Sequence, residues 1–303
     1  MNSKKYKSPR ALEMAVRDAA RNSNQDTGQA IDNFYHDRLL ERVFSEQEPS
    51  FVLKGGRGML ARTVNARHTR DTDFLYRGVD LNEAVSELER LAAVDLDDFL
   101  EFRLVSTSKI AEDQEYRDGY RIEFVPVFGG KRLTRKISID LVVNQVYSDD
   151  ADEVVPASRL EVKGLPVFNY RVYRVTSAIA DKVCATMQKY SGGRASSRIR
   201  DLADLSVYLT TETFDGEELS NKIALERQLR KEDPIDAFHV PENWMELYGH
   251  VYEKIAAEAS LPVEYRDVAA AERLVKTCVD GALSGEVDGL SWSPDLLQWV
   301  PNL

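Results

Sequence analysis

The chain has 303 residues, 43% of them apolar and 9% aromatic, which is enough to bury the core of one large domain or two ordinary ones. A formal net charge of -11 argues against a protein that coats nucleic acid over its whole surface, because such binding depends on many cationic side chains. No stretch is apolar for the roughly eighteen residues that a membrane span needs, and no apolar segment follows the basic start. We expect a cytoplasmic protein without a membrane partner.

Cysteine and histidine form no recognisable metal or redox motif. Cys184 and Cys278 lie far apart within apolar helical patterns, which favours buried thiols in a reducing compartment over a disulfide. The histidines show neither HxxxH nor HxH spacing and have no cysteine partner, so we expect no zinc site. A bound metal ion should therefore have oxygen ligands.

Hydrophobic spacing predicts an N-terminal half that mixes helices and strands. Apolar residues at intervals of three and four indicate helices, and short or alternating apolar runs bounded by glycine or proline indicate strands. Gly129-Gly130 favours a hairpin between the last two of these runs. The predicted elements, in chain order, are helices over 11–23 and 31–44, a strand at 51–53, a helix over 58–63, a strand at 71–76, a helix over 81–93 and β-prone runs at 102–110, 120–128 and 133–143.

The second half of the chain has a helical pattern, and tryptophans near its end are expected to dock on the body of the protein. We therefore predict an α+β protein, with a mixed-sheet domain over 1–170 and a helical domain over 171–303. The candidate helices of the second domain cover 175–190, 197–209, 217–231, 242–257 and 263–283.

The carboxylate pair Asp71 and Asp73 is the strongest candidate for a chemical site. Residues two apart on a strand point to the same side, and paired carboxylates bind Mg²⁺ while substrate phosphates complete its coordination. Gly55-Gly56 precedes the pair, between a strand and a helix, where backbone N–H groups can bind phosphate. Asp140 lies in a hydrophobic strand and could join the pair, since three carboxylates can hold the two metal ions of a phosphoryl-transfer site.

Each of these features has an ordinary structural explanation when it is taken alone. Aspartate pairs most often end a solvated strand or form a turn, and Gly-Gly is about as often a simple tight turn. An isolated DxD is therefore a weak signal. The combination of the pair with a preceding glycine turn and a third strand acid is what favours a magnesium-dependent site for a triphosphate.

Four segments of the chain carry a further signal. They read Leu53-Lys54-Gly55-Gly56, Arg67-His68-Thr69-Arg70-Asp71-Thr72-Asp73-Phe74, Ala178-Ile179-Ala180-Asp181-Lys182-Val183 and Arg198-Ile199-Arg200-Asp201-Leu202-Ala203-Asp204-Leu205. In this order they resemble the four motifs of the AbiEii/AbiGii-type nucleotidyltransferase toxins, a family within the DNA polymerase β-like nucleotidyltransferase superfamily. The resemblance covers roughly 51–209 and leaves the first helices and everything after Leu209 unassigned.

The resemblance implies a set of site residues. One position departs from the family, because Arg57 stands where family members have a small hydroxyl residue, and a long cation there could contact a triphosphate directly. The implied catalytic residues are Asp71, Asp73, Lys182 and Asp201, and the implied triphosphate-binding residues are Gly55, Gly56, Arg57 and Thr69, together with Lys182.

Spacing alone also bears on Lys182 and Asp201. Lys182 lies on a largely apolar helix, where a cation usually serves a charged partner or a phosphate, although a surface lysine whose stem packs on apolar groups is the commoner case. Arg198 and Asp201 share a helix face, and an ordinary helix salt bridge is the alternative there. Because Ser191-Gly192-Gly193 separates the two helices, we expect Lys182 and Asp201 to face each other across a helical hairpin.

The predicted reaction is attack by an acceptor hydroxyl on the α-phosphate of a nucleoside triphosphate, with release of pyrophosphate, in a cleft between the two domains. By resemblance, the acceptor is the 3′ end of a tRNA, and the protein is a toxin restrained by a cognate antitoxin. Arg194, Arg198 and Arg200 are expected to bind RNA phosphates. Two alternatives stay open: a transferase of the same fold that modifies a protein or small molecule, and an inactive module that binds RNA or the antitoxin.

Overall fold

The computed structural model describes residues 6–64, 66–67, 69, 71–110, 119–143 and 151–302, which fall into two compact units. The N-terminal unit consists of Met1–Val64 and Thr69–Val172, and the C-terminal unit consists of Asn65–His68 and Tyr173–Leu303. Two residues of the second family motif, His68 and Arg70, lie outside the described residues.

Capping side chains fix where several helices of the N-terminal unit begin. Its described helices are α1 (Pro9–Arg21), α2 (Thr27–Val43), α3 (Gly55–Arg62) and α4 (Leu81–Ala92). Ser8, Asp26 and Asp80 accept hydrogen bonds from first-turn N–H groups of α1, α2 and α4. The start of α3 differs, because it follows directly from a strand through the glycine turn.

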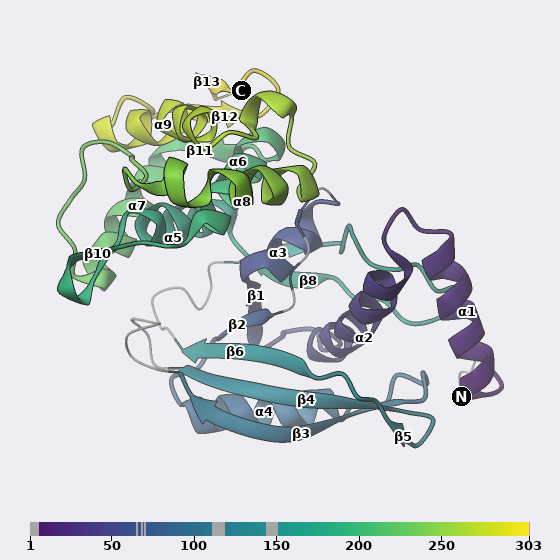
Figure 1. Cartoon of the computed structure of the whole chain (residues 1–303). Coiled ribbons are helices and arrows are strands. Elements are labelled where there is room, and N and C mark those ends of the chain that lie inside the picture. Colours follow the sequence, from purple (N-terminus) through teal and green to yellow (C-terminus); the bar gives the residue numbers. More distant parts are fainter. Residues whose placement is uncertain are drawn as a thin grey trace. The chain divides into compact units, whose positions relative to one another are not determined.

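A mixed sheet forms the centre of this unit. Its strands are β1 (Phe51–Lys54), β2 (Thr72–Tyr76), β3 (Leu100–Lys109), β4 (Gly119–Phe128), β5 (Lys131–Arg132), β6 (Ile137–Val143), β7 (Ala151–Val154) and β8 (Tyr170–Tyr173). They lie in the order β3-β4-β6-β2-β1-β8-β7, with β5 paired to β4 (Figure 1). The central strand β2 pairs antiparallel with β1 and parallel with β6, so it brings distant segments side by side.

The two faces of the sheet differ in polarity. Apolar residues of one face, among them Phe74, Ile122 and Leu141, belong to the main hydrophobic core together with residues of α1, α2 and α4. Side chains alternate along each strand, so the neighbours of these residues point to the opposite face. Asp73 and Asp140 lie on that opposite, more polar face.

The C-terminal unit is built around a buried helix, α6. Helices α5, α8 and α9 contact α6, and α7 packs against α5, which explains why α6 carries few exposed side chains. The described elements of this unit are α5 (Val175–Met187), β9 (Lys189–Tyr190), a 3-10 turn (Ser191–Gly193), β10 (Arg194–Ala195), α6 (Ile199–Thr211), β11 (Phe214–Asp215), α7 (Gly216–Arg230), α8 (Trp244–Glu258), a second 3-10 turn (Val263–Tyr265), α9 (Val268–Ser284), β12 (Leu290–Ser293) and β13 (Gln298–Pro301).

The C-terminal tryptophans dock on the helices, as predicted, within a small sheet formed by β11, β12 and β13. Trp292 is fully buried, and its indole N–H donates to the carbonyl oxygen of Leu209 at 2.8 Å. The indole N–H of Trp299 donates to the carbonyl oxygen of Cys278 at 3.1 Å. These contacts attach the end of the chain to α6 and α9.

The predicted α+β fold with a helical second half is confirmed. Helix α3 begins at Gly55, earlier than the predicted start at residue 58, because the glycines form its first turn instead of preceding it. The short strands β7, β8, β12 and β13 were not predicted, since pairing with distant segments defines them more than local pattern does. No helix in the described part of the chain is long and apolar enough to cross a bilayer.

Candidate active site

The turn between β1 and α3 requires glycine at its first position. Gly55 has a φ of 59°, in the left-handed region, and a Cβ built on it would lie 1.9 Å from Oδ2 of Asp73. Only the absence of a side chain at Gly55 lets the Asp73 carboxylate lie against the start of α3. The structure thus brings together the predicted glycine turn and one of the two predicted carboxylates.

Thr69 lies against the second glycine in a similar way. A Cβ on Gly56 would be 2.9 Å from both Cβ and Oγ1 of Thr69. The side chain of the N-cap residue of α3, Lys54, makes no capping hydrogen bond with the helix. Backbone N–H groups at an uncapped helix start have no intrahelical partner, and together with the helix dipole they favour a bound anion such as phosphate.

Four charged side chains form a row across adjacent strands on the polar face of the sheet. Lys54 on β1 is the register partner of Asp73 on β2, and Asp73 is the partner of Asp140 on β6. Asp140 is in turn the partner of Arg121 on β4. Because directly paired residues point to the same face, the row reads cation, acid, acid, cation. We call it the charged row.

Arg121 holds Asp140 through two parallel hydrogen bonds. Its Nε donates to Oδ1 at 2.8 Å and its Nη2 donates to Oδ2 at 2.7 Å. The pKa of the Arg121 guanidinium lies above its ordinary value, first because of the hydrogen bond to Asp140 and, to a smaller extent, because of the charges on Asp71 and Asp73. Arg121 therefore belongs to the same charged cluster as the predicted metal ligands.

Asp71 and Asp73 suit a divalent cation that arrives with a triphosphate. Asp71 is exposed immediately before β2, and Asp73 is partly exposed beside the uncapped start of α3. Mg²⁺ is commonly held by one or two carboxylates together with substrate phosphates, and this arrangement offers that donor set. The described residues contain no cluster of three or more acidic, histidine or cysteine side chains that could hold a metal ion. The predicted role of Asp140 as a third ligand stays a prediction.

Arg57 points into the N-terminal unit. Its side chain is 4% exposed, and its Nη1 lies 4.0 Å from Oδ1 of Asp37 on α2. Burial raises the pKa of Asp37 to about 6, although the charge of Arg57 acts in the opposite direction. Burial also lowers the pKa of Arg57, against smaller opposing effects of Asp37, Tyr170 and Asp71. This contact ties the first turn of α3 to α2, and direct binding of a triphosphate by Arg57 stays a prediction.

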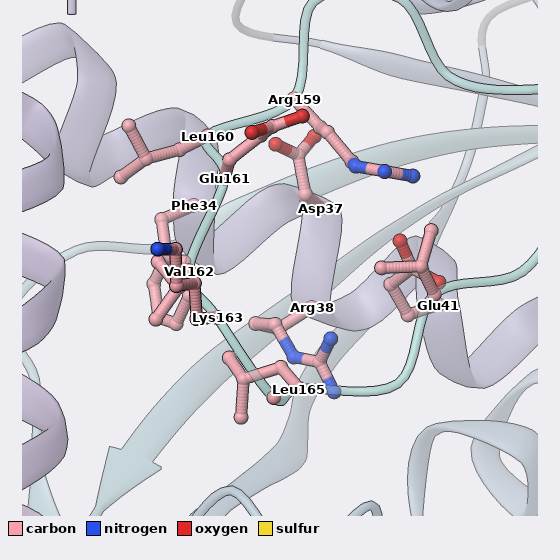
Figure 2. Close-up of a pocket in the computed structure, with 12 residues that line it drawn as sticks. Phe34, Asp37, Arg38, Glu41, Arg159, Leu160, Glu161, Val162, Lys163 and Leu165 are labelled. Atoms are coloured by element: carbon pink, nitrogen blue, oxygen red, sulfur yellow. The ribbon is translucent and has the colours of Figure 1, made fainter.

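A cavity of about 220 Å³ lies between α2 and the segment 159–167 (Figure 2). Phe34, Asp37, Arg38 and Glu41 line it from one face of α2. Burial raises the pKa of Glu41 to about 7. Its carboxylate accepts a hydrogen bond from the backbone N–H of Phe168, which acts in the opposite direction on this pKa. None of the lining residues is a predicted site residue, but Asp37 links the cavity to Arg57.

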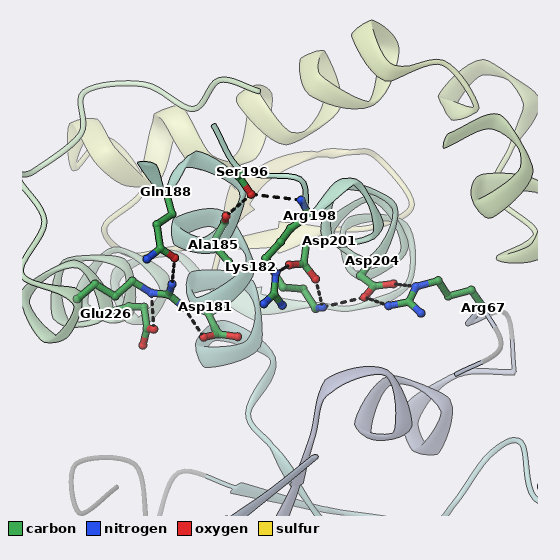
Figure 3. Close-up of polar contacts among 11 residues, drawn as sticks. Arg67, Asp181, Lys182, Ala185, Gln188, Ser196, Arg198, Asp201, Asp204 and Glu226 are labelled. Carbon is green, nitrogen blue, oxygen red and sulfur yellow. Dashed lines mark hydrogen bonds and ion pairs between the residues drawn. The ribbon is translucent and has the colours of Figure 1, made fainter. Parts of the chain in front are cut away.

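Lys182 in the C-terminal unit contacts two acids of α6 (Figure 3). Its Nζ donates to Oδ1 of Asp201 at 2.8 Å and to Oδ2 of Asp204 at 2.7 Å. The predicted position of Lys182 opposite Asp201 is therefore confirmed. Arg198 donates to the other oxygen of Asp201, and Arg67 binds Asp204 through Nε at 2.9 Å and Nη2 at 3.0 Å. We call these five side chains the buried ion cluster.

Mutual charge compensation keeps this cluster ionised although it is buried. Lys182, Asp201 and Asp204 are 6%, 3% and 1% exposed. Burial by itself would raise the pKa of Asp201, but Arg198 and Lys182 outweigh burial and hold that pKa at about 2. Burial would likewise lower the pKa of Lys182, and the two carboxylates raise it above its ordinary value instead. Lys182 therefore stays charged at neutral pH, with two of its hydrogen bonds committed to α6.

Sequence reasoning missed three residues of these arrangements. Arg121 carried no local signal, because its relation to Asp140 arises from the pairing of β4 with β6. Asp204 stands three residues after Asp201 on one helix, a spacing that could have indicated a second partner for Lys182. Arg67 reaches Asp204 from 137 positions away in the chain, which no local pattern predicts.

Comparison with known proteins settles the family. A model described as nucleotidyl transferase AbiEii toxin, type IV TA system, matches residues 38–272, more than half of the chain. The chain belongs to the AbiEii family. The predicted resemblance is thereby confirmed, and the match includes every candidate site residue of both units. It follows that this AbiEii protein is a member of a nucleotidyltransferase family from type IV toxin–antitoxin systems.

Two solved structures, both from Helicobacter pylori, are similar to the AbiEii protein at 15% sequence identity. One is a candidate nucleotidyltransferase, aligned over 85% of this chain and 97% of that chain with a TM-score of 0.46. The other is JHP933, aligned over 85% of this chain and 94% of that chain with a TM-score of 0.45. No curated protein matches the chain.

Proposed function

We propose that this AbiEii protein transfers a nucleoside monophosphate from a nucleoside triphosphate to the 3′ end of a tRNA, with Mg²⁺ as its cofactor. It acts in this proposal as the toxin of a toxin–antitoxin pair, neutralised by a cognate antitoxin. The observation that carries the proposal is the contact of the Asp73 carboxylate with Gly55 at the start of α3. This contact places the start of α3, the proposed phosphate-binding element, beside a carboxylate that is a proposed ligand of the cation.

The start of α3 binds the triphosphate in this proposal. Backbone N–H groups of the Gly55-Gly56 turn donate to phosphate oxygens, and the Thr69 hydroxyl, which lies against Gly56, donates from the side. Glycine at both positions lets the side chains of Asp73 and Thr69 lie against the start of the helix. The triphosphate is thereby oriented with its phosphates beside the carboxylates on the polar face of the sheet.

Asp71 and Asp73 hold the divalent cation. When bound there, the cation supplies positive charge to the reacting phosphate and favours ionisation of the attacking hydroxyl. The two carboxylates orient the substrate, and that of Asp73 lies against Gly55, beside the proposed phosphate-binding turn. Lys182 and Asp201 are part of the proposal as catalytic residues, and the match of the family model across both residues supports them.

RNA is the proposed acceptor, and basic residues of the C-terminal unit are its proposed binding surface. Arg194 and Arg200 are exposed, so both can contact phosphates. Arg198 also pairs with Asp201, which leaves its other donors for RNA. This protein remains acidic overall, which favours a local contact with the end of an RNA over extensive coating.

A transfer assay tests the proposal. The purified chain is incubated with each α-labelled nucleoside triphosphate, Mg²⁺ and total cellular RNA, and label is expected on RNA of tRNA size. Asp71→Asn should abolish transfer, because it removes the negative charge of one ligand of the cation. Glu89→Gln, which changes an exposed acid on α4 of the same unit, should leave transfer unchanged.

Each alternative has its own outcome in this assay. Label on protein or on small molecules instead of RNA would show that the acceptor is a protein or a small molecule and not a tRNA. Binding of triphosphate without transfer to any fraction would favour an inactive binding module. Equal transfer by the intact chain and by Asp71→Asn would refute the proposed cation site.

A further inference from the structure

The charged row has a cationic side chain at each end, which is more positive charge than a binding site for two metal ions requires. The acids Asp71, Asp73 and Asp140 are the three carboxylates that the sequence offers for such a site. In the structure, Lys54 and Arg121 flank the central acids of the row. These two side chains balance two of the three negative charges on Asp71, Asp73 and Asp140 before any metal ion binds.

Asp140 is already paired with Arg121, which makes its carboxylate a poor ligand for a second metal ion. Both of its oxygens accept hydrogen bonds from Arg121, at 2.8 Å and 2.7 Å. Strand register fixes the pair, because Arg121 and Asp140 are directly opposite each other on β4 and β6. A metal ion bound to the remaining lone pairs of Asp140 would lie next to the guanidinium, with charges of the same sign close together.

Arg121 also reaches the solvent side of the site. Its side chain is 49% exposed, whereas that of Asp140 is 22% exposed, so the guanidinium covers the carboxylate and faces outward. Asp140 takes two of its N–H donors, and the others can bind a phosphate. Planar guanidinium groups bind phosphate through two parallel hydrogen bonds at once, which the single ammonium group of a lysine does not reproduce.

We propose that Arg121 takes the place of a second metal ion, so that the chain binds one divalent cation, through Asp71 and Asp73, while Arg121 binds the triphosphate beside it. This inference rests on the proposed function, since it concerns the same site. Arg121 becomes a substrate-binding residue, and Asp140 becomes the positioning residue that holds its guanidinium in place. The positive charge that a second ion would bring is built into the protein.

Manganese electron paramagnetic resonance tests this inference without relying on turnover. The full chain is saturated with Mn²⁺ and a triphosphate analogue that resists cleavage between the α- and β-phosphates. Two Mn²⁺ ions in one site lie roughly 3.5–4 Å apart and couple magnetically, whereas a single ion gives an uncoupled spectrum. The intact chain is expected to bind one uncoupled ion.

Variants of the pair make the prediction specific. Arg121→Met frees Asp140 and should admit a second, coupled Mn²⁺ ion, and adding Asp140→Asn to that variant should return the count to one. Arg103→Met is the matched control, because Arg103 is also an exposed strand arginine paired with an acid, Glu101. It should leave the spectrum of the intact chain unchanged.

Affinity for the analogue provides a second measurement. The double variant lacks both the guanidinium and any second ion, so it should bind the analogue about tenfold to a hundredfold more weakly than Asp140→Asn, which keeps Arg121. A coupled pair of ions in the intact chain would overturn the inference and leave the proposed function standing. The inference would also be overturned by a single Mn²⁺ ion in Arg121→Met, or by equal affinities of the double variant and Asp140→Asn for the analogue. If the intact chain bound no Mn²⁺ at all, both the proposed function and the inference would fall.

Discussion

Replacing Gly55 with alanine tests the contact that unites the candidate site. The substitution forces a side chain into the left-handed region, at φ 59°, which costs about 1–2 kcal/mol. Its Cβ would also lie 1.9 Å from Oδ2 of Asp73, so the carboxylate must turn away. Displacing a packed group typically costs about 1–3 kcal/mol more, and we expect Gly55→Ala to lower the free energy of unfolding by about 2–5 kcal/mol in total.

Gly130→Ala separates the two contributions. Gly130 has a φ of 81°, also left-handed, and a Cβ built on it would have no atom within 4 Å. This variant should therefore show the backbone strain alone, about 1–2 kcal/mol. Adding Asp73→Ala to Gly55→Ala should bring the cost of the glycine substitution down to a similar value, because the clashing carboxylate is gone.

The assay must report on the N-terminal unit. All three tryptophans of the chain, Trp244, Trp292 and Trp299, lie in the C-terminal unit, so tryptophan fluorescence does not follow unfolding of the sheet. Hydrogen exchange of the β1 and β2 amides, measured by mass spectrometry, does follow it. Mn²⁺ binding is measured alongside and should be lost in Gly55→Ala and retained in Gly130→Ala. Equal losses of stability in the two glycine variants, or an unchanged cost in the Asp73→Ala background, would refute the reasoning.

Two further predictions concern buried charges. The pKa of Glu41 is about 7 in the folded protein and about 4.5 when unfolded, so stability should fall as the pH rises from 4.5 through 7, by up to roughly 3 kcal/mol. Glu41→Gln should reduce this decline when hydrogen exchange of the N-terminal unit is followed from pH 4.5 to 8, and the part due to Asp37, whose pKa is about 6, should remain. An equal decline in the intact chain and the variant would contradict the assignment to Glu41. Lys182→Met leaves Asp201 and Asp204 buried with one partner fewer each, and should cost about 3–5 kcal/mol in urea unfolding monitored by tryptophan fluorescence. A loss of stability below about 1 kcal/mol would mean that Arg198 and Arg67 by themselves compensate the charges of Asp201 and Asp204.

The Lys182 prediction also affects how activity data are interpreted. A variant of Lys182 that loses transfer activity shows a catalytic role only if the C-terminal unit remains folded. The buried ion cluster holds α5 against α6, so stability and catalysis can fail together. Unfolding and transfer should therefore be measured on the same preparations.

Local sequence pattern by itself determined much of this protein. The spacing of Asp71, just before β2, and Asp73, within it, predicts two carboxylates on one side, because side chains alternate along any extended strand. A glycine turn between the strand and the helix was predicted from the conformational freedom of glycine, although the glycines proved to be the first residues of α3. Helix periodicity likewise located most helices of both units, and the positions of Lys182 and Asp201 on neighbouring helices followed from the glycine loop between them.

Only the tertiary structure decided which charges meet. Asp73 lies beside Asp140, and Asp140 beside Arg121, because β2, β6 and β4 are neighbours in the sheet, and strand order is not encoded in spacing along the chain. The inward direction of Arg57 likewise involves a distant segment, since Oδ1 of Asp37 on α2 lies 4.0 Å from its Nη1. Local conformation depends on neighbouring residues and can be predicted from them, whereas the partner of a charged side chain depends on packing between segments that are far apart in the sequence.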